Sequence, residues 1–232
     1  MKKFIILSFL IICGGGILYT ASAIFMATES YPGGTILDRQ STGYDWWNNY
    51  LSDLGRRRAW NGTSNVVSNN YFDNGLRIAA LLMVVLFNLL PFLFEEGKQR
   101  VRAILVALLS FGSALAYIGI VWYPLDVNYR LHTVCVRIGF ISFWILSLLF
   151  AGLIRKEQRY PNFFAAVMYL FAIVFLIQIG IMLLGPRAWS SPAALQLQVT
   201  AQKIIVGLQL FVMLIQTVGL SLFILRPKQA VN

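Results

Sequence analysis

Long apolar runs separated by short charged clusters dominate the chain. A helix needs about 20 apolar residues to cross the ~30 Å hydrocarbon core of a membrane, because each residue advances it by ~1.5 Å. Six runs have about this length: residues 4–27, 78–94, 103–123, 131–154, 163–185 and 204–225. Their continuous Leu, Ile, Val and Phe content favours helices over the alternating strands of a barrel. The pattern predicts an all-α, polytopic membrane helix bundle with six transmembrane helices, forming one integral membrane domain over residues 1–232.

The first run allows a second interpretation. Lys2 and Lys3, the apolar stretch and the Ala21-Ser22-Ala23 tripeptide resemble a signal peptide with its cleavage site. The stretch is longer than the 7–15 apolar residues of a typical signal peptide. A retained first helix is therefore favoured.

Lysine and arginine positions predict the orientation of the bundle. With the N-terminus inside, the short cytoplasmic pieces are residues 1–3, 95–102, 155–161 and 226–232, and they hold ten basic residues. The longer loops of the opposite face hold only seven. Because cytoplasmic loops are enriched in Lys and Arg, both termini are predicted to be cytoplasmic. The expected location is a bacterial inner membrane.

Composition narrows the class of protein. Hydrophobic residues make up 58% of the chain and charged residues 12%, against about 45–50% and 25% in soluble domains, which excludes an ordinary water-soluble enzyme. The net charge of +10 is attributed to topology and to contact with anionic lipids, and no nucleic-acid-binding motif accompanies it. Cys13 and Cys135 fall at different membrane depths, and there is one histidine. We therefore expect neither a disulfide nor a metal site, and no cofactor.

The long loop over residues 28–73 is predicted to lie outside and to carry a short amphipathic helix. The segment Asp45–Gly55 places Trp46, Trp47 and Tyr50 on one side and Asn49 and Ser52 on the other, with Asp53 at the boundary. Asp45 is suited to cap its start and Gly55 to end it. The helix is either a structural lid on the bundle or a carrier of Asn49, Ser52 and Asp53 toward a ligand.

Further candidate residues surround the start of the fourth span. Asp126 and His132 lie on one short connection and are expected to approach each other, which suits either proton chemistry or a plain structural bond. Arg137 lies roughly 7–9 Å into the span, where a charge must be paired or hydrated. Its expected partner is Asp53, Asp73 or Asp126, and the alternative is a bound anion.

Amide side chains recur within the apolar runs. In hydrocarbon they must find partners, so they are expected to face the bundle interior, either bonding between helices or lining a path for a solute. This predicted polar core stripe consists of Asn88, Gln178, Gln202, Gln209 and Gln216.

Three motifs resemble an uncharacterised membrane family. They are Tyr31-Pro-Gly-Gly-Thr35, Asn49-Tyr-Leu-Ser-Asp-Leu-Gly55, and Tyr123-Pro-Leu-Asp126 followed by His132. They are similar to the six-helix family known as domain of unknown function 998, itself distantly similar to the Frag/DRAM/Sfk membrane proteins. The resemblance implies six helices with polar motifs gathered at one membrane face, and it implies no activity.

Three classes of function remain open. The favoured one is a non-enzymatic membrane protein that binds a lipid headgroup or small solute at its outer face, or serves as a subunit of a membrane assembly. Its partners would be membrane lipids and other membrane-protein subunits, and no nucleic acid. A small-solute transporter or channel is the alternative, and a membrane-embedded hydrolase using Ser52, Asp53, Asp126 and His132 is the third.

Overall fold

A computed structural model describes residues 2–94 and 97–226, and it confirms the predicted helical bundle. The helices are α1 (Lys2–Glu29), α2 (Val66–Asn88), α3 (Leu90–Leu93), α4 (Gly97–Trp122), α5 (Tyr129–Arg155), α6 (Asn162–Leu184) and α7 (Pro192–Leu225). Since α2 and α3 together form one span, six segments are long and apolar enough to cross a membrane. The described part of the chain contains no strand longer than an isolated bridge.

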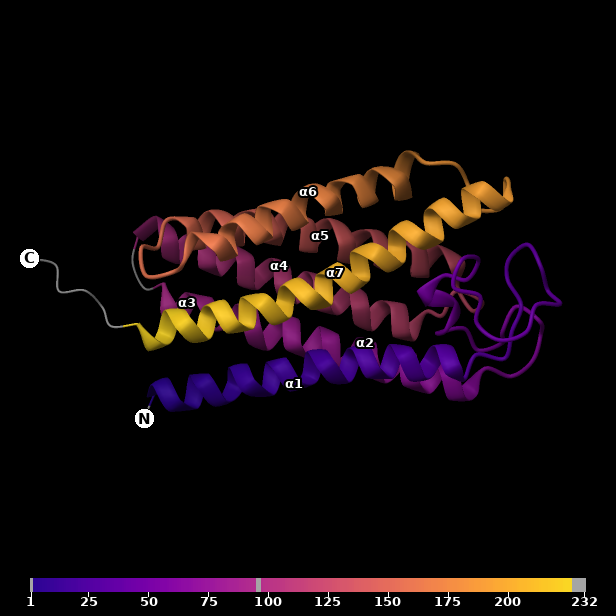
Figure 1. The fold of residues 1–232 in the computed structure, drawn as a ribbon, viewed down its shortest axis with the longest axis horizontal. Helices are drawn as coiled ribbons and strands as arrows, with labels where there is room; N and C mark the ends of the chain where they lie inside the picture. Colours follow the sequence, from indigo (N-terminus) through magenta and orange to yellow (C-terminus); the bar gives the residue numbers. More distant parts are fainter. Residues whose placement is uncertain (1, 95–96, 227–232) are drawn as a thin grey trace, which may run out of the picture.

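The spans lie side by side along the long axis of the molecule (Figure 1). Consecutive spans pack against one another from α1 to α7, and α7 also packs against α1. The start of α1 and the end of α7 lie at the same end of the bundle, and the long loop lies at the other (Figure 1). This arrangement agrees with an even number of crossings, and the assignment of one end to the cytoplasm still rests on the charge distribution.

Two helices extend further toward the loop end than their apolar runs. Helix α2 begins at Val66 rather than near Ile78, and α7 begins at Pro192 rather than near Ile204. Proline suits the first position of a helix, because its missing N–H would be unpaired there. Ser191 caps α7 by accepting a hydrogen bond from the Ala194 N–H at 3.1 Å.

Aromatic side chains fill the centre of the bundle. The Phe87 ring of α2 meets Phe143 and Phe150 of α5 edge to face, with centroids 6.2 and 5.5 Å apart. Phe143 continues the contact to Phe175 of α6. These four rings are almost completely buried, so they join three helices through the geometry that aromatic pairs prefer.

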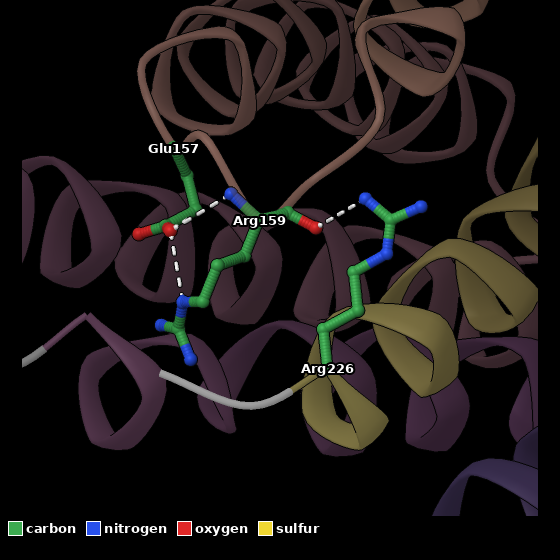
Figure 2. Close-up of polar contacts among 3 residues, drawn as sticks. All are labelled: Glu157, Arg159 and Arg226. Atoms are coloured by element: carbon green, nitrogen blue, oxygen red, sulfur yellow. Dashed lines mark hydrogen bonds and ion pairs between the residues drawn. The ribbon is translucent and has the colours of Figure 1, made fainter. Parts of the chain in front are cut away.

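The connection between α5 and α6 is fastened to the end of α7 (Figure 2). The Arg159 Nε donates to Glu157 Oε1 at 3.0 Å, and the Arg159 carbonyl accepts from Arg226 Nη1 at 3.1 Å. The Arg159 guanidinium also lies 4.4 Å from the centre of the Phe223 ring. These contacts hold the predicted cytoplasmic end together.

The loop between α1 and α2 corrects one prediction. Its only helical piece among the described residues is η1 (Leu51–Asp53), a single 3-10 turn, so the predicted helix over Asp45–Gly55 is wrong in length. Asp45 does cap a turn, by accepting from the Trp47 and Asn48 N–H groups. The Leu51 N–H, however, donates to Gln202 Oε1 at 2.9 Å. Since that donor is taken by α7, the local helix cannot propagate.

Candidate functional site

The Asp53 carboxylate organises the loop from its interior. It is 1% exposed and accepts three hydrogen bonds, from Trp60 Nε1 at 2.8 Å, the Tyr50 N–H at 2.9 Å and Asn49 Nδ2 at 3.1 Å. Burial raises the pKa of Asp53, while Asn49, Arg56, Trp60 and Tyr50 lower it. The structure thus brings the predicted residues Asn49 and Asp53 together, as the internal framework of the loop.

Asn49 completes this framework. It is fully buried, and its Nδ2 also donates to the Gly34 carbonyl at 2.9 Å, while its Oδ1 accepts from the Asp45 N–H at 3.0 Å. Gly34 has φ +84°, and a Cβ there would meet the backbone of Trp60 and Asn61. Glycine is therefore required at this position.

Arg56 and Trp60 form a pair that the sequence reasoning missed. The Arg56 guanidinium stacks 3.7 Å from the centre of the Trp60 ring, and its Nε donates to the Arg58 carbonyl at 3.0 Å. Because Trp60 also bonds Asp53, the carboxylate, the indole and the guanidinium form one chain of contacts. No spacing rule marks this pair in the sequence.

The side chains of Asp126 and His132 bond to different groups. Asp126 accepts from the Arg57 and Arg58 N–H groups at 3.0 and 2.9 Å, which ties the α4–α5 connection to the long loop. His132 is buried, and its Nδ1 lies 2.9 Å from the Tyr123 carbonyl oxygen. Within residues 2–94 and 97–226, no hydrogen bond joins Asp126 to His132, and none joins any two of the four proposed hydrolase residues.

A cavity of about 520 Å³ lies between α5, α6, the start of α7 and the long loop. We call it the arginine cavity. Its polar lining includes Ser52, Arg56, His132, Arg137, Gln178, Arg187, Gln198 and Gln202, and the aromatic lining includes Tyr50, Trp60, Tyr129 and Trp189. Among the described residues, none that lines it is an Asp or Glu. Of the predicted candidates, Ser52, His132 and Arg137 line it, whereas Asn49, Asp53 and Asp126 do not.

Arg137 corrects a second prediction. Among the described residues, the ion pairs are Arg77 with Asp73 at 3.9 Å and Arg159 with Glu157, so the expected acidic partner of Arg137 is absent. Arg137 is an exposed residue that lies about 12 Å along α5 from Tyr129, at 1.5 Å per residue. It therefore presents a charge to the cavity at a depth where charges require compensation.

The amide side chains do not form one continuous lining. Gln178 and Gln202 line the arginine cavity, whereas Gln209 Oε1 accepts from the Tyr117 hydroxyl at 2.9 Å and Gln216 Nε2 donates to the Phe164 carbonyl at 2.9 Å. Asn88 is an exposed residue rather than an interior one. Its Nδ2 donates to the Val84 carbonyl of its own helix at 2.8 Å and, as predicted for bonding between helices, to Ser110 Oγ of α4 at 3.4 Å.

The side-chain amide of Gln178, in the wall of the arginine cavity, has an acceptor atom available for a ligand. Gln178 is 5% exposed, and its Oε1 is buried without a hydrogen-bond partner among the described residues. An unsatisfied buried acceptor costs about 1–3 kcal/mol, so this amide is placed to take a donor from a ligand or water in the cavity.

The fold and the cavity define a multi-pass integral membrane protein with a cationic hollow at one end. The family described as "Protein of unknown function (DUF998)" matches residues 30–218, and the chain belongs to this family. The matched range contains every residue that lines the arginine cavity. No curated protein and no solved structure matches the chain. The comparisons do not show the expected similarity to the Frag/DRAM/Sfk proteins.

Proposed function

We propose that this protein binds the anionic headgroup of a membrane lipid in the arginine cavity, without catalysing a reaction on it. One observation carries the proposal: Arg56, Arg137 and Arg187 line a cavity whose walls, in the part of the chain that the structure describes, contain no carboxylate. A guanidinium offers a planar set of donors that matches phosphate and carboxylate oxygens. The headgroup is therefore expected to be a phosphate or carboxylate.

The depth of Arg137 supports a lipid as the source of the anion. A charge within the membrane costs a few kcal/mol unless it is paired or hydrated, and the acids near the cavity are bonded to other groups. Lipid headgroups lie at the level of the helix ends, so an anionic one can compensate the guanidinium from the outer leaflet. In this proposal the protein resides in a bacterial inner membrane with the long loop outside.

The amide contacts support a binding site rather than a path across the membrane. Below the arginine cavity, Gln209 bonds Tyr117 and Gln216 bonds Phe164. A transport path would need these groups free to face water or solute. The hydrolase hypothesis finds less support, because Ser52 and His132 share the cavity without a hydrogen bond between them, which a nucleophile and its base require.

The test compares lipid retention in two charge-matched variants. The protein is purified in lipid nanodiscs of phosphatidylcholine with added phosphatidylglycerol, and retained lipids are identified by native mass spectrometry. Loss of one charge-assisted contact costs about 1.5–3 kcal/mol, so Arg137→Gln is expected to weaken phosphatidylglycerol binding about 10- to 150-fold. Arg130→Gln removes the same charge from an exposed position of α5 outside the cavity and should bind like wild type.

Two results would overturn the proposal. Retention of phosphatidylcholine and phosphatidylglycerol by wild-type protein in the proportions of the disc would mean that the arginines do not select an anionic headgroup. Equal loss of phosphatidylglycerol in Arg137→Gln and Arg130→Gln would mean that the effect comes from net charge rather than from the cavity.

A further inference from the structure

A second, smaller cavity adjoins the arginine cavity on its bundle side. It has a volume of about 70 Å³, and we call it the apolar cavity. Ser52, Val136, Phe140 and Gln202 line both cavities. The two hollows are therefore neighbours that share one wall, formed by the long loop, α5 and α7.

Most of the apolar cavity is lined by hydrocarbon side chains from α1, α2, α4, α5 and α7. Three of its polar side chains, Thr20, Tyr117 and Gln209, already have hydrogen bonds. The Tyr117 hydroxyl donates to Gln209 Oε1 at 2.9 Å, and the Thr20 hydroxyl donates to the Gly16 carbonyl at 3.0 Å. A dry apolar cavity of ~150 Å³ is large enough to bind benzene. A hollow about half that size suits a few carbons of an alkyl chain rather than ordered water.

Helix α5 connects the two hollows directly. Val136 and Phe140 lie one turn apart and line both cavities, and Arg137 stands between them in the sequence and lines only the arginine cavity. One turn of α5 thus places the Arg137 guanidinium in the arginine cavity and the Val136 and Phe140 side chains in the wall that the two cavities share.

We propose that the ligand is an anionic amphiphile whose headgroup occupies the arginine cavity and whose apolar chain enters the apolar cavity past Ser52, Val136, Phe140 and Gln202. This inference rests on the proposed function, and it adds the chemical class of the whole ligand. A membrane phospholipid and a soluble single-chain phosphate share the required chemistry, and the experiment separates them.

The experiment uses the full chain in nanodiscs of phosphatidylcholine alone. Inorganic phosphate and decyl phosphate are titrated at fixed lipid concentration, and binding is followed by tryptophan fluorescence, because Trp60 and Trp189 line the arginine cavity. Wild-type protein is expected to bind decyl phosphate more tightly than phosphate. Each methylene removed from an apolar environment lowers affinity about fourfold.

The decisive variant fills the apolar cavity. Ala79 of α2 lines only that cavity, so Ala79→Leu should displace about two methylenes and weaken decyl phosphate binding at least about tenfold, with phosphate binding unchanged. Val206→Phe fills the same cavity from α7 and should have the same effect if Ala79→Leu does not fold. The matched control is Ala21→Leu, which adds the same side chain on an exposed face of α1.

The outcomes are distinguishable. If neither probe binds wild-type protein, the proposed function fails and this inference fails with it. If both probes bind but Ala79→Leu and Val206→Phe keep the wild-type preference for decyl phosphate, the placement of the alkyl chain in the apolar cavity is overturned and the proposed function stands. When phosphatidylglycerol is then added to the discs, displacement of decyl phosphate identifies membrane phospholipid as the source, and unchanged binding identifies a soluble amphiphile.

Discussion

Replacement of Asp53 by alanine is expected to destabilise the protein and to impair the arginine cavity. The carboxylate receives hydrogen bonds from Trp60, Tyr50 and Asn49 while it is 1% exposed. In Asp53→Ala these three donors lose their acceptor at once. Arg56 also loses its electrostatic attraction to the buried Asp53 carboxylate, and the indole on which Arg56 stacks loses its hydrogen bond to that carboxylate.

The magnitude follows from the surroundings of each donor. A buried donor left without a partner costs about 1–3 kcal/mol. Asn49 Nδ2 keeps its bond to the Gly34 carbonyl, and Tyr50 and Trp60 are only partly buried, so each donor is assigned a value near the lower end. The sum is about 3–5 kcal/mol. For a chain of this length, each kcal/mol shifts the melting temperature by about 2–4 °C, which gives a decrease of about 6–20 °C.

The assay is thermal unfolding of the purified protein in detergent, read as the fraction that elutes as a monodisperse peak after heating. Asp38→Ala is the control, because Asp38 is an exposed acid of the same loop whose carboxylate accepts, within residues 2–94 and 97–226, only from the Gln40 N–H. It should shift the melting temperature by no more than a few degrees. A melting temperature for Asp53→Ala equal to that of Asp38→Ala would refute the assignment of Asp53 as the centre of the loop.

Two further predictions use the same assay. Gly34→Ala should lower the free energy of unfolding by more than about 3 kcal/mol, because φ at Gly34 is +84° and the new Cβ would meet backbone atoms. Gly43→Ala should lower it by about 1 kcal/mol, because φ at Gly43 is +66° but the space around it is open. Similar losses in the two variants would contradict the close packing at Gly34. Because burial raises the pKa of Asp53, the native state binds a proton more tightly than the unfolded state does. The free energy of unfolding should therefore fall as pH rises above the ordinary aspartate pKa of about 3.9, and Asp53→Asn should lack this component of the pH profile.

The spans were predictable from sequence because a membrane leaves the backbone few choices. With no water to bond, N–H and C=O groups must pair within a helix, so hydropathy alone locates the segments. The same criterion missed the first turns of α2 and α7, since residues such as Asn69 and Lys203 are polar. There the helix continues beneath the long loop, and the loop supplies partners: the Gly55 carbonyl accepts from Asn69, and the Asn49 carbonyl accepts from Lys203 at 2.6 Å.

The shape of the long loop was not predictable from local pattern. The segment around Leu51 has the spacing of an amphipathic helix, but its backbone is bonded by Gln202, 151 residues away along the chain. The stacking of Arg56 on Trp60 likewise depends on how the loop folds around Asp53. Local periodicity describes a helix in isolation, and here tertiary contacts take the backbone donors that such a helix would use.

Arg137 shows why the ion pairs of the protein could not be predicted from the sequence. Each of the three acids proposed as its partner has another role: Asp53 accepts from Trp60, Asp73 faces Arg77, and Asp126 binds two backbone N–H groups of the long loop. None of these contacts involves an arginine side chain that lines the cavity. Asp53 and Asp126 thus bond groups of the long loop, Asp73 pairs within α2, and the described lining of the cavity remains cationic. A variant that introduces a carboxylate into the cavity wall separates two explanations of this charge. If the charge has no role in binding, the variant should be more stable and should bind lipid as the wild type does. If the cavity binds an anionic headgroup, the variant should lose that lipid.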